Sequence, residues 1–279
     1  MSALQQFARD EQFLRLVRRE RDVDLVVAAL EIARDGQPEL TFDPTLRAIR
    51  SAVSELTRPI AMAGSEMSEL NLLVEYLTER LNLHGDDDCF DCPECSYLNR
   101  VVDTGRGIPI TLSLIYMAIA NELGIPIVGV SAPSHFVVQL ETDHGVVYID
   151  AFRGGHIMSS RECVHWLHEI TELPTAEIRP TLKPASDRQV IVRMLNNLKS
   201  LFGSREDWVS AWKVQQRLAL LNPTSYRDKR DLALLTLRAG RPGEAIDLIS
   251  RCIEVGHVEE LPLLQQHLRE ARRESPRYN

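Results

Sequence analysis

Apolar residues recur at helical spacing through roughly the first 82 positions. Apolar side chains three or four residues apart share one face of a helix, so each stripe of this kind predicts an amphipathic helix. We interpret the three stripes as packing elements that bury one face each. The stripes are Leu25, Ala28, Ala29 and Ile32; Leu46, Ile49, Val53 and Leu56; and Leu70, Leu73, Val74, Leu77 and Leu81.

Residues 107–123 show a different pattern, with apolar residues on every side of the predicted helix. A helix that is apolar all round belongs in the interior of a domain. Pro109 suits its first turn, because the N–H that proline lacks would have no intrahelical partner there. The apolar positions are Ile108, Ile110, Leu112, Leu114, Ile115, Met117, Ala118, Ile119 and Leu123.

Three short apolar runs follow this helix and predict strands over residues 127–130, 136–140 and 146–149. Asp143-His144-Gly145 supplies a hairpin turn between the last two. A buried helix packed on a small antiparallel sheet predicts an α+β core.

The pattern is helical again after Pro174, Pro180 and Pro184. Ala211 and Ala245 lie thirty-four residues apart, which is the tetratricopeptide period, and residues 240–245 predict the start of a helix. Because the signal covers only about one and a half repeats, a plain helical hairpin remains an alternative. The patterns together predict three segments: helices over 1–82, the α+β core over 83–184 and an all-helical tail over 185–279.

Composition narrows the functional classes. Of the 279 residues, 44% are hydrophobic and 26% charged, as in ordinary globular proteins. A net charge of −8 argues against a nucleic-acid partner. The chain has no apolar run of about twenty residues that would span a membrane, and its first ten residues lack the build of a signal peptide. Three of the five cysteines crowd into seven positions, unlike a disulfide framework, so we expect a reduced, cytoplasmic protein without a cofactor.

His135 and Asp150 follow the buried helix in the order of the base and the acid in Cys-His-Asp sites. In such sites the nucleophile is a Cys at the helix N-terminus, where the dipole lowers its thiol pKa. This chain has Pro109 there. Thr111 points about 200° away from position 109, and Ser113 returns to about 40° but lies roughly 6 Å further along the axis. We expect His135 and Asp150 on adjacent antiparallel strands; a buried hydrogen-bonded pair that tethers the strands is the simpler alternative.

Cys89, Cys92 and Cys95 form a second candidate cluster, because cysteines two residues apart can chelate zinc and His84 would complete a tetrahedral set. Structural zinc sites usually join two separated ligand pairs, and no second pair is present, so we expect no bound metal. We expect instead three reduced, exposed thiols in an irregular acidic segment, residues 84–95. A further alternative is that Cys95 approaches His135 and supplies a displaced nucleophile.

Arg106-Gly107-Ile108-Pro109 and Leu123-Gly124-Ile125-Pro126 frame the buried helix. With these motifs the chain resembles the SirB-type family of bacterial transglutaminase-like proteins, which have tetratricopeptide-like C-termini. The resemblance covers nearly the whole chain. Its other segments are Cys95-Ser96-Tyr97-Leu98-Asn99, the run 105–113, His135-Phe136, Asp150-Ala151-Phe152 with Gly154-Gly155, and Arg193-Met194-Leu195-Asn196-Asn197-Leu198. The family usually has Asn where this chain has Cys95, and Pro where it has Ala151.

The resemblance implies a papain- or transglutaminase-like core in which His135 and Asp150 match the catalytic His and acid and Pro109 replaces the nucleophile. It therefore implies a catalytically inactive, cytoplasmic binding or regulatory module. Protein partners would bind the helical tail and the His135/Asp150 cleft. The rival hypothesis is a hydrolase or acyltransferase with a displaced nucleophile, Cys95 or Ser113.

Overall fold

The computed structural model describes residues 3–256 and 258–275, so the outermost positions of the first and third predicted segments lie outside it. Residues 10–194 form one compact unit, and the described residues of 1–9 and 195–279 form another. The chain passes from the first unit to the second within α10 (Asp187–Ser204). No helix in the described ranges combines the length and the apolarity that a membrane crossing requires.

The three apolar stripes of the N-terminal region form helices, as predicted. The stripe residues Ala28, Ala29 and Ile32 are buried in α3, and Ile49 and Leu56 in α4. The first unit begins with α2 (Glu11–Val17), α3 (Leu25–Ala33), α4 (Asp43–Ala61), α5 (Glu66–Glu75) and a π-helical turn, Tyr76–Arg80.

Helix α7 (Pro109–Glu122) is the predicted all-apolar helix, and the structure confirms that it is buried. It contacts α3, α4 and α6 (Leu98–Thr104) as well as strands β1 (Val128–Val130) and β2 (Val137–Thr142). Eleven of its fourteen side chains are buried, which explains why it has no polar face. Pro109 is its first residue, as expected from the missing N–H.

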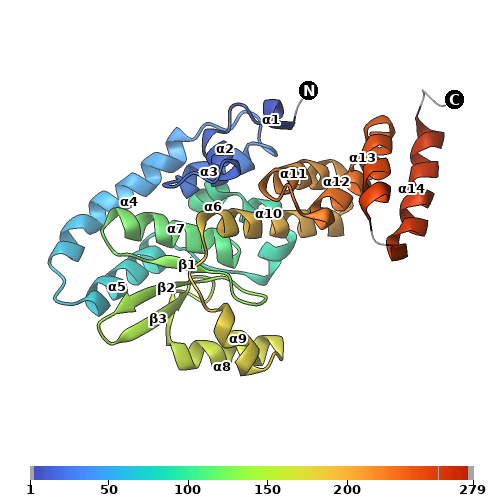
Figure 1. The fold of residues 1–279 in the computed structure, drawn as a ribbon. Coiled ribbons are helices and arrows are strands. Elements are labelled where there is room, and N and C mark those ends of the chain that lie inside the picture. The colour runs from blue at the N-terminus through green and yellow to red at the C-terminus, as the bar shows by residue number, and fades with distance from the viewer. Residues whose placement is uncertain (1–2, 257, 276–279) are drawn as a thin grey trace. The chain divides into compact units, whose positions relative to one another are not determined.

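Helix α7 packs on a four-stranded antiparallel sheet with the order β1-β2-β3-β4 (Figure 1). The three expected strands are confirmed with small shifts in their ends, and the fourth was not expected. Thr142 pairs with Gly145, which leaves Asp143 and His144 as the turn of the predicted hairpin. The strands are β1 (Val128–Val130), β2 (Val137–Thr142), β3 (Gly145–Asp150) and β4 (His156–Ser159).

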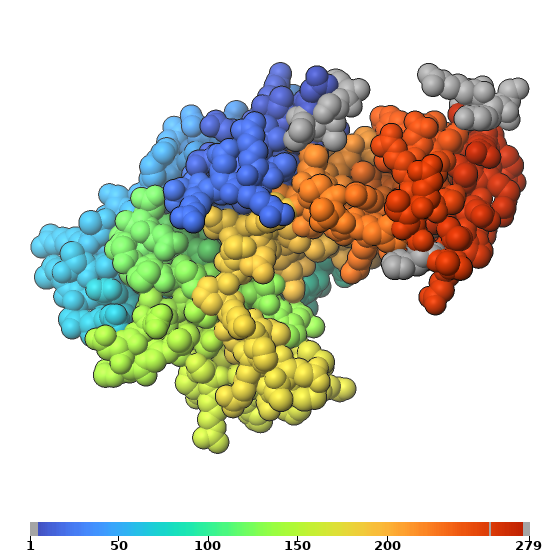
Figure 2. Space-filling view, viewed as in Figure 1, coloured from blue at the N-terminus to red at the C-terminus, as the bar shows by residue number. Residues whose placement is uncertain are grey.

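Two further helices, α8 (Ser160–Thr171) and α9 (Thr175–Ile178), complete the core beside the sheet. In Figure 2 these two helices belong to the yellow atoms in the lower part of the view. They enclose a cluster of buried side chains that comes from all four strands and both helices. It includes Val130, Val137, Tyr148, Met158, Cys163, Val164, Leu167 and Ile178.

The acidic segment before α6 is more ordered than its sequence predicts. We expected residues 84–95 to be irregular, but they contain two 3₁₀ helices, Asp87–Asp91 and Pro93–Ser96. Gly105 then ends α6 with φ +74°, and a Cβ at that position would lie 2.4 Å from the carbonyl oxygen of Asn82. Glycine is required here because the backbone is left-handed and the neighbouring chain is in contact.

The second unit is all-helical, as predicted for the tail. Its helix pairs repeat: α11 and α13 begin thirty-four residues apart, at Trp208 and Pro242. Ala211 and Ala245, the residues that suggested the period, are both fully buried. The helices are α11 (Trp208–Leu221), α12 (Tyr226–Arg238), α13 (Pro242–Val255) and α14 (Leu261–Glu274), together with α1 (Ala3–Gln6).

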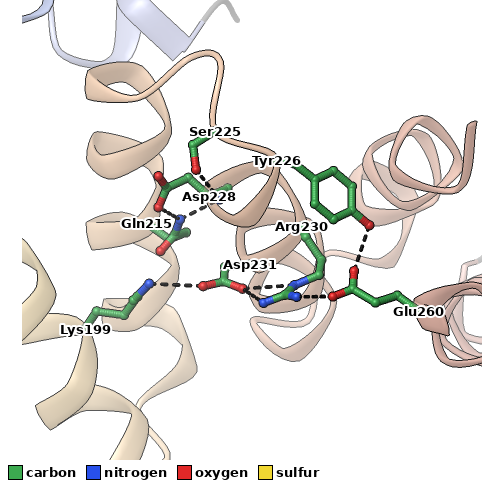
Figure 3. A network of polar contacts seen from close by, with 8 residues as sticks. All are labelled: Lys199, Gln215, Ser225, Tyr226, Asp228, Arg230, Asp231 and Glu260. Atoms are coloured by element: carbon green, nitrogen blue, oxygen red, sulfur yellow. Dashed lines mark hydrogen bonds and ion pairs between the residues drawn. The ribbon is translucent and has the colours of Figure 1, made fainter. Parts of the chain in front are cut away.

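A chain of polar contacts links the helices of this unit (Figure 3). Lys199 of α10 pairs with Asp231 at 3.1 Å, and Asp231 pairs with Arg230 at 3.0 Å. Arg230 also pairs with Glu260, which accepts a hydrogen bond from the Tyr226 hydroxyl at 2.9 Å. The network therefore connects α10, α12 and the 3₁₀ turn Val258–Glu260 before α14.

Candidate functional site

His135 lies in the turn between β1 and β2, two residues before β2 begins. Its N–H donates to the carbonyl of Ala132 at 3.3 Å, and Ser134 before it has φ +56°. The prediction that His135 lies on a strand is therefore wrong, because this left-handed turn delays strand pairing until Val137. Its side chain is nevertheless buried, at 8% exposure for the residue.

Asp150 is the last residue of β3 and is completely buried. Its Oδ1 atom accepts a hydrogen bond from His135 Nε2 at 2.9 Å, as well as from the backbone N–H groups of Phe152 at 3.0 Å and Arg153 at 3.3 Å. Such an Asx turn fixes the carboxylate against its own backbone. The predicted contact between His135 and Asp150 is present, and the carboxylate holds the imidazole in one orientation.

Aromatic side chains enclose the His135 ring. Trp166 of α8 meets it edge-on with ring centroids 4.9 Å apart, and Phe152 does so at 6.0 Å. Arg153 in turn lies over the Trp166 ring at 5.3 Å. His135 Nδ1 makes no hydrogen bond within the described part of the chain, so it is the ring nitrogen left for a nucleophile or a ligand.

The start of α7 provides no nucleophile. Pro109 occupies the first helical position and has only a prolyl ring there. Thr111 donates its hydroxyl to the carbonyls of Cys95 at 2.8 Å and Ile108 at 3.0 Å, so it is committed to the backbone. Ser113 is completely buried and has no hydrogen-bond partner among the described residues.

The thiols before α6 face one another. Cys95 Sγ donates to Cys89 Sγ at 2.7 Å, and both residues are buried, whereas Cys92 is partly exposed and contacts Glu94 at 3.1 Å. Burial, followed by the contact with Cys89, raises the pKa of the Cys95 thiol. We had expected exposed thiols in an irregular loop; the compact 3₁₀ turns bury two of the three instead.

The zinc alternative gains no geometric support. Within the residues that the structure describes, no three His, Cys, Asp or Glu side chains are grouped as metal ligands would be. The Nδ1 atom of His84 lies 2.7 Å from the carbonyl oxygen of Asn82. This ring nitrogen is therefore engaged with the backbone.

The Asp150 carboxylate affects the pKa values of two other buried groups, the Cys163 thiol and the Tyr116 phenol. Burial and then the charge of Asp150 raise the pKa of the Cys163 thiol to about 12, and the same two causes raise the pKa of the Tyr116 phenol. Both groups therefore stay protonated at neutral pH. Tyr116 OH and Asp150 Oδ2 are buried and have no hydrogen-bond partner within the described ranges.

The sequence pointed to His135 and Asp150 but not to the residues that shape their surroundings. Trp166 lies thirty-one positions after His135, and nothing in the spacing of helix α8 indicates that its ring contacts the imidazole. Phe152 had a local signal, since it follows Asp150 by two residues in a motif we had singled out. Tyr116 gave no signal in the sequence, because it lies in a helix that is apolar on every side.

A sequence profile described as the transglutaminase-like superfamily matches residues 43–196, which span more than half of the chain and include the His135–Asp150 pair. The chain belongs to this superfamily. The transglutaminase-like match includes α7, the four strands and the thiol cluster, so the candidate site lies within the shared region. No solved structure matches the chain.

Two bacterial relatives place this transglutaminase-like protein in the SirB-type family, and a mouse protein shares a similar region. A UPF0162 protein of Xylella fastidiosa (strain Temecula1) is 31% identical over 242 residues, which cover 85% of each chain. Protein SirB1 of Salmonella typhimurium is 26% identical over 189 residues, 65% of this chain and 70% of that one. Mouse F-box only protein 21 is 27% identical over 224 residues, which are 77% of this chain but 33% of the longer relative.

Proposed function

We propose that this SirB-type protein is a catalytically inactive, cytoplasmic module that binds or regulates another protein. The observation that carries the proposal is that Pro109 is the first residue of α7 while the chain keeps a His135–Asp150 pair. A prolyl ring can supply no thiolate or alkoxide. The next hydroxyl, that of Thr111, donates a hydrogen bond to the backbone, and the hydroxyl residue after it, Ser113, is completely buried.

The state of the thiols supports the same proposal. A nucleophilic Cys needs a lowered pKa and a base within hydrogen-bond reach. The pKa of Cys95 is instead raised, and its thiol contacts Cys89. His135 makes its one side-chain hydrogen bond, among the described residues, to Asp150.

The binding half of the proposal has two supports. The helix pairs repeat at thirty-four residues, the spacing of tetratricopeptide repeats, which commonly build binding surfaces. In addition, the region shared with F-box only protein 21 makes up 33% of that relative, so a related region occurs as one part of a longer chain. A binding module can be reused in this way without any chemistry of its own.

A thiol probe tests the loss of catalysis. We expect iodoacetamide to label wild type and His135→Ala at the same rate, with Cys92 the most reactive thiol in both because it is the partly exposed one of its cluster. The labelled residues are identified by mass spectrometry. Rapid labelling of Cys95 near neutral pH that slows by orders of magnitude in His135→Ala would establish the rival hydrolase. That rival has one structural support, because the Cys95 carbonyl accepts the N–H of Ile108, next to Pro109.

The complementary variant restores a nucleophile. Pro109→Cys places a thiol at the first position of α7, where the helix dipole and His135 would lower its pKa. We expect this thiol to react faster at pH 7 than Cys92 in the same protein, and the additional His135→Ala change to remove the gain. An unreactive thiol in a folded Pro109→Cys variant would mean that the pair only tethers the turn before β2 to the end of β3.

A capture experiment tests binding through the helical tail. The second unit has a pocket of about 600 Å³, with Lys199, Asp231, Leu234, Arg238 and Glu270 among its lining residues. We expect Arg238→Glu to lose a partner that the wild-type chain captures from native cytoplasm. Arg272→Glu, the matched charge reversal on an exposed residue that does not line this pocket, should keep it. Equal capture by both variants would contradict binding in this pocket.

A further inference from the structure

The cluster of Cys89, Cys92 and Cys95 has no part in the proposed binding function, yet its geometry is specific. Cys89 and Cys95 are 0% and 4% exposed, and their sulfur atoms lie 2.7 Å apart, inside the contact distance of two non-bonded sulfurs. Cys95 also interacts with Cys92, the partly exposed thiol. Two thiols are therefore in contact, and the thiol of a third, partly exposed residue interacts with one of them.

The backbone explains why the first and third cysteines meet. In one continuous 3₁₀ helix, residues six apart would be separated by about 12 Å of rise. Here Cys89 lies in the turn Asp87–Asp91 and Cys95 in the turn Pro93–Ser96. Cys92, between them, is extended with φ −119° and ψ 112°, so the chain changes direction at that residue and brings Cys95 back to Cys89.

We propose that Cys89 and Cys95 form a reversible disulfide, and that Cys92 is the thiol through which a low-molecular-weight disulfide oxidises them. The pair would be a redox modification site that requires neither His135 nor a bound protein. The covalent bond would replace an existing contact between the two sulfurs. No movement of a distant segment is therefore needed to bring the thiols together.

The exchange balances with one molecule of the oxidant R–S–S–R. The Cys92 thiolate attacks one sulfur of the oxidant, forms a mixed disulfide and releases RS⁻. The Cys95 thiolate then attacks Cys92 Sγ and releases the second RS⁻, and the Cys89 thiolate attacks Cys95 Sγ and frees Cys92. Two protein thiols lose their protons to the two RS⁻ ions, so the chain is oxidised by two electrons and the oxidant is reduced to two RSH.

The charged surroundings favour a slow exchange. Arg106 lies near enough to Cys89 and Cys95 to interact with both, and a guanidinium stabilises a thiolate. However, Arg106 is also paired with Asp86 at 2.9 Å, and Cys92 donates to the Glu94 carboxylate. These carboxylates oppose the formation of thiolates. The oxidation of Cys89 and Cys95 by a low-molecular-weight disulfide should therefore take minutes to hours rather than seconds.

The disulfide would also stabilise the start of α7. The Cys95 carbonyl accepts the N–H of Ile108 at 3.2 Å and the hydroxyl of Thr111 at 2.8 Å. Joining Cys95 to Cys89 would therefore tie both 3₁₀ turns to the first turn of the buried helix. A cross-link of this kind restricts the unfolded chain, so we expect the oxidised protein to melt at a higher temperature than the reduced one.

Thiol counting on the full chain tests the proposal. After metal analysis and treatment with a chelator, the native protein is incubated with glutathione disulfide and then unfolded in guanidinium chloride, where iodoacetamide blocks every free thiol. The remaining disulfides are reduced and labelled with a heavy alkylating reagent. We expect the number of free thiols to fall from five to three, and dithiothreitol to restore five. Trypsin places all three residues on one peptide, 81–100, so one fragment spectrum shows which cysteines carry the heavy label. We expect Cys89 and Cys95.

Single variants separate the roles of the three thiols. The Cys89→Ser variant should be unable to form the buried disulfide, because Cys95 has lost its partner. The Cys92→Ser variant should reach the same oxidised state as the wild-type chain, but at least tenfold more slowly. Cys163→Ser and Cys252→Ser, which remove single buried cysteines elsewhere, should still lose two thiols on oxidation. Circular dichroism confirms that each variant is folded.

Several results would overturn the proposal. One is a native wild-type chain that keeps five thiols while its urea-unfolded form loses them. Another is a heavy label on Cys92 in place of Cys89 or Cys95, or a Cys92→Ser variant that never oxidises. A zinc ion that resists the chelator at about one per chain would show that the cluster serves metal binding instead.

Discussion

At the scale of single residues, the buried contact between His135 and Asp150 does most to hold the candidate site in its arrangement. Oδ1 of Asp150 accepts three hydrogen bonds in a position with no solvent exposure. When one partner of a buried polar pair is removed, the other is left without compensation, which costs more than the pair contributes. The pair can therefore be retained for stability even where no nucleophile is present.

Asp150→Ala tests this structural role. We expect it to lower the free energy of unfolding by about 3 kcal/mol, because it leaves His135 Nε2 and two backbone N–H groups without their acceptor. Urea denaturation followed by circular dichroism measures the change. Asp103→Ala, which removes an exposed ion pair with Arg100 at 3.7 Å, should change stability by less than about 0.5 kcal/mol. Equal effects of the two substitutions would show that the buried pair does not stabilise the fold.

Residue type and order were enough to select His135, Asp150 and Pro109, because each of these side chains implies a definite chemistry. The same reasoning misjudged Cys89 and Cys95. Their neighbours in the sequence are acidic, which suggested exposure, but both are buried. Burial depends on what the rest of the chain places over a residue, and local composition does not contain that information.

At the scale of elements, the helices with strong apolar periodicity were predicted correctly, whereas a short strand was missed. Helices α3, α4 and α7 follow from their apolar patterns. Strand β4 (His156–Ser159) was missed because four residues show no clear alternation and it follows two glycines, Gly154 and Gly155. It exists because Val147, Tyr148, Ile149 and Asp150 of β3 pair with it. Helix α8 begins directly after it, at a capping box.

This capping box provides an element-scale prediction. The Ser159 hydroxyl accepts the N–H of Glu162, whose carboxylate accepts the N–H and hydroxyl of Ser159. We expect Ser159→Ala to lower the free energy of unfolding at pH 7 by about 1 kcal/mol, because the first turn of α8 loses its cap. Thermal denaturation measures the loss. Ser160→Ala, one residue further and outside the box, is the matched control and should have a smaller effect.

The cost of Ser159→Ala should depend on pH. The Ser159 hydroxyl and then its backbone N–H hold the pKa of Glu162 below its usual value. A carboxyl with a depressed folded-state pKa contributes stability above its unfolded pKa, near 4.3 for Glu, and loses it as the pH falls through the folded value. The difference between wild type and Ser159→Ala should therefore shrink from pH 7 towards pH 3. A difference that stays constant over this range would contradict the role of the carboxylate.

At the scale of the whole chain, the grouping of residues follows contacts rather than sequence order. The described residues of 1–9 are grouped with those of 195–279. Gln6 donates to the side chain of Gln216 at 2.9 Å, and Arg217 lies over the Phe7 ring at 4.2 Å. These contacts join positions about 210 residues apart, which no periodic pattern indicates.

Net charge is also a property of the whole chain, and it predicts what the protein does not bind. With a net charge of −8 and an isoelectric point near 5.6, the chain should be repelled by phosphate backbones. We expect a column of immobilised double-stranded DNA not to retain the protein at 0.15 M salt. The protein should elute in the same volume when the salt is lowered to 0.05 M. Fluorescence anisotropy with labelled DNA checks the result. Binding that weakens steeply with salt would reveal a basic surface that the total charge conceals.

The sequence by itself determined the α+β class, the main helices, the hairpin and the residue types at the candidate site, because these depend on periodicity, turn chemistry and side-chain identity within short stretches. The tertiary structure alone decided which distant groups meet. It placed Trp166 against His135, left Tyr116 OH buried with no partner among the described residues, folded Cys95 back onto Cys89, and grouped the described residues of 1–9 with the C-terminal helices. Contacts between residues far apart in the chain depend on how all the buried surfaces pack together, and no local stretch specifies that packing.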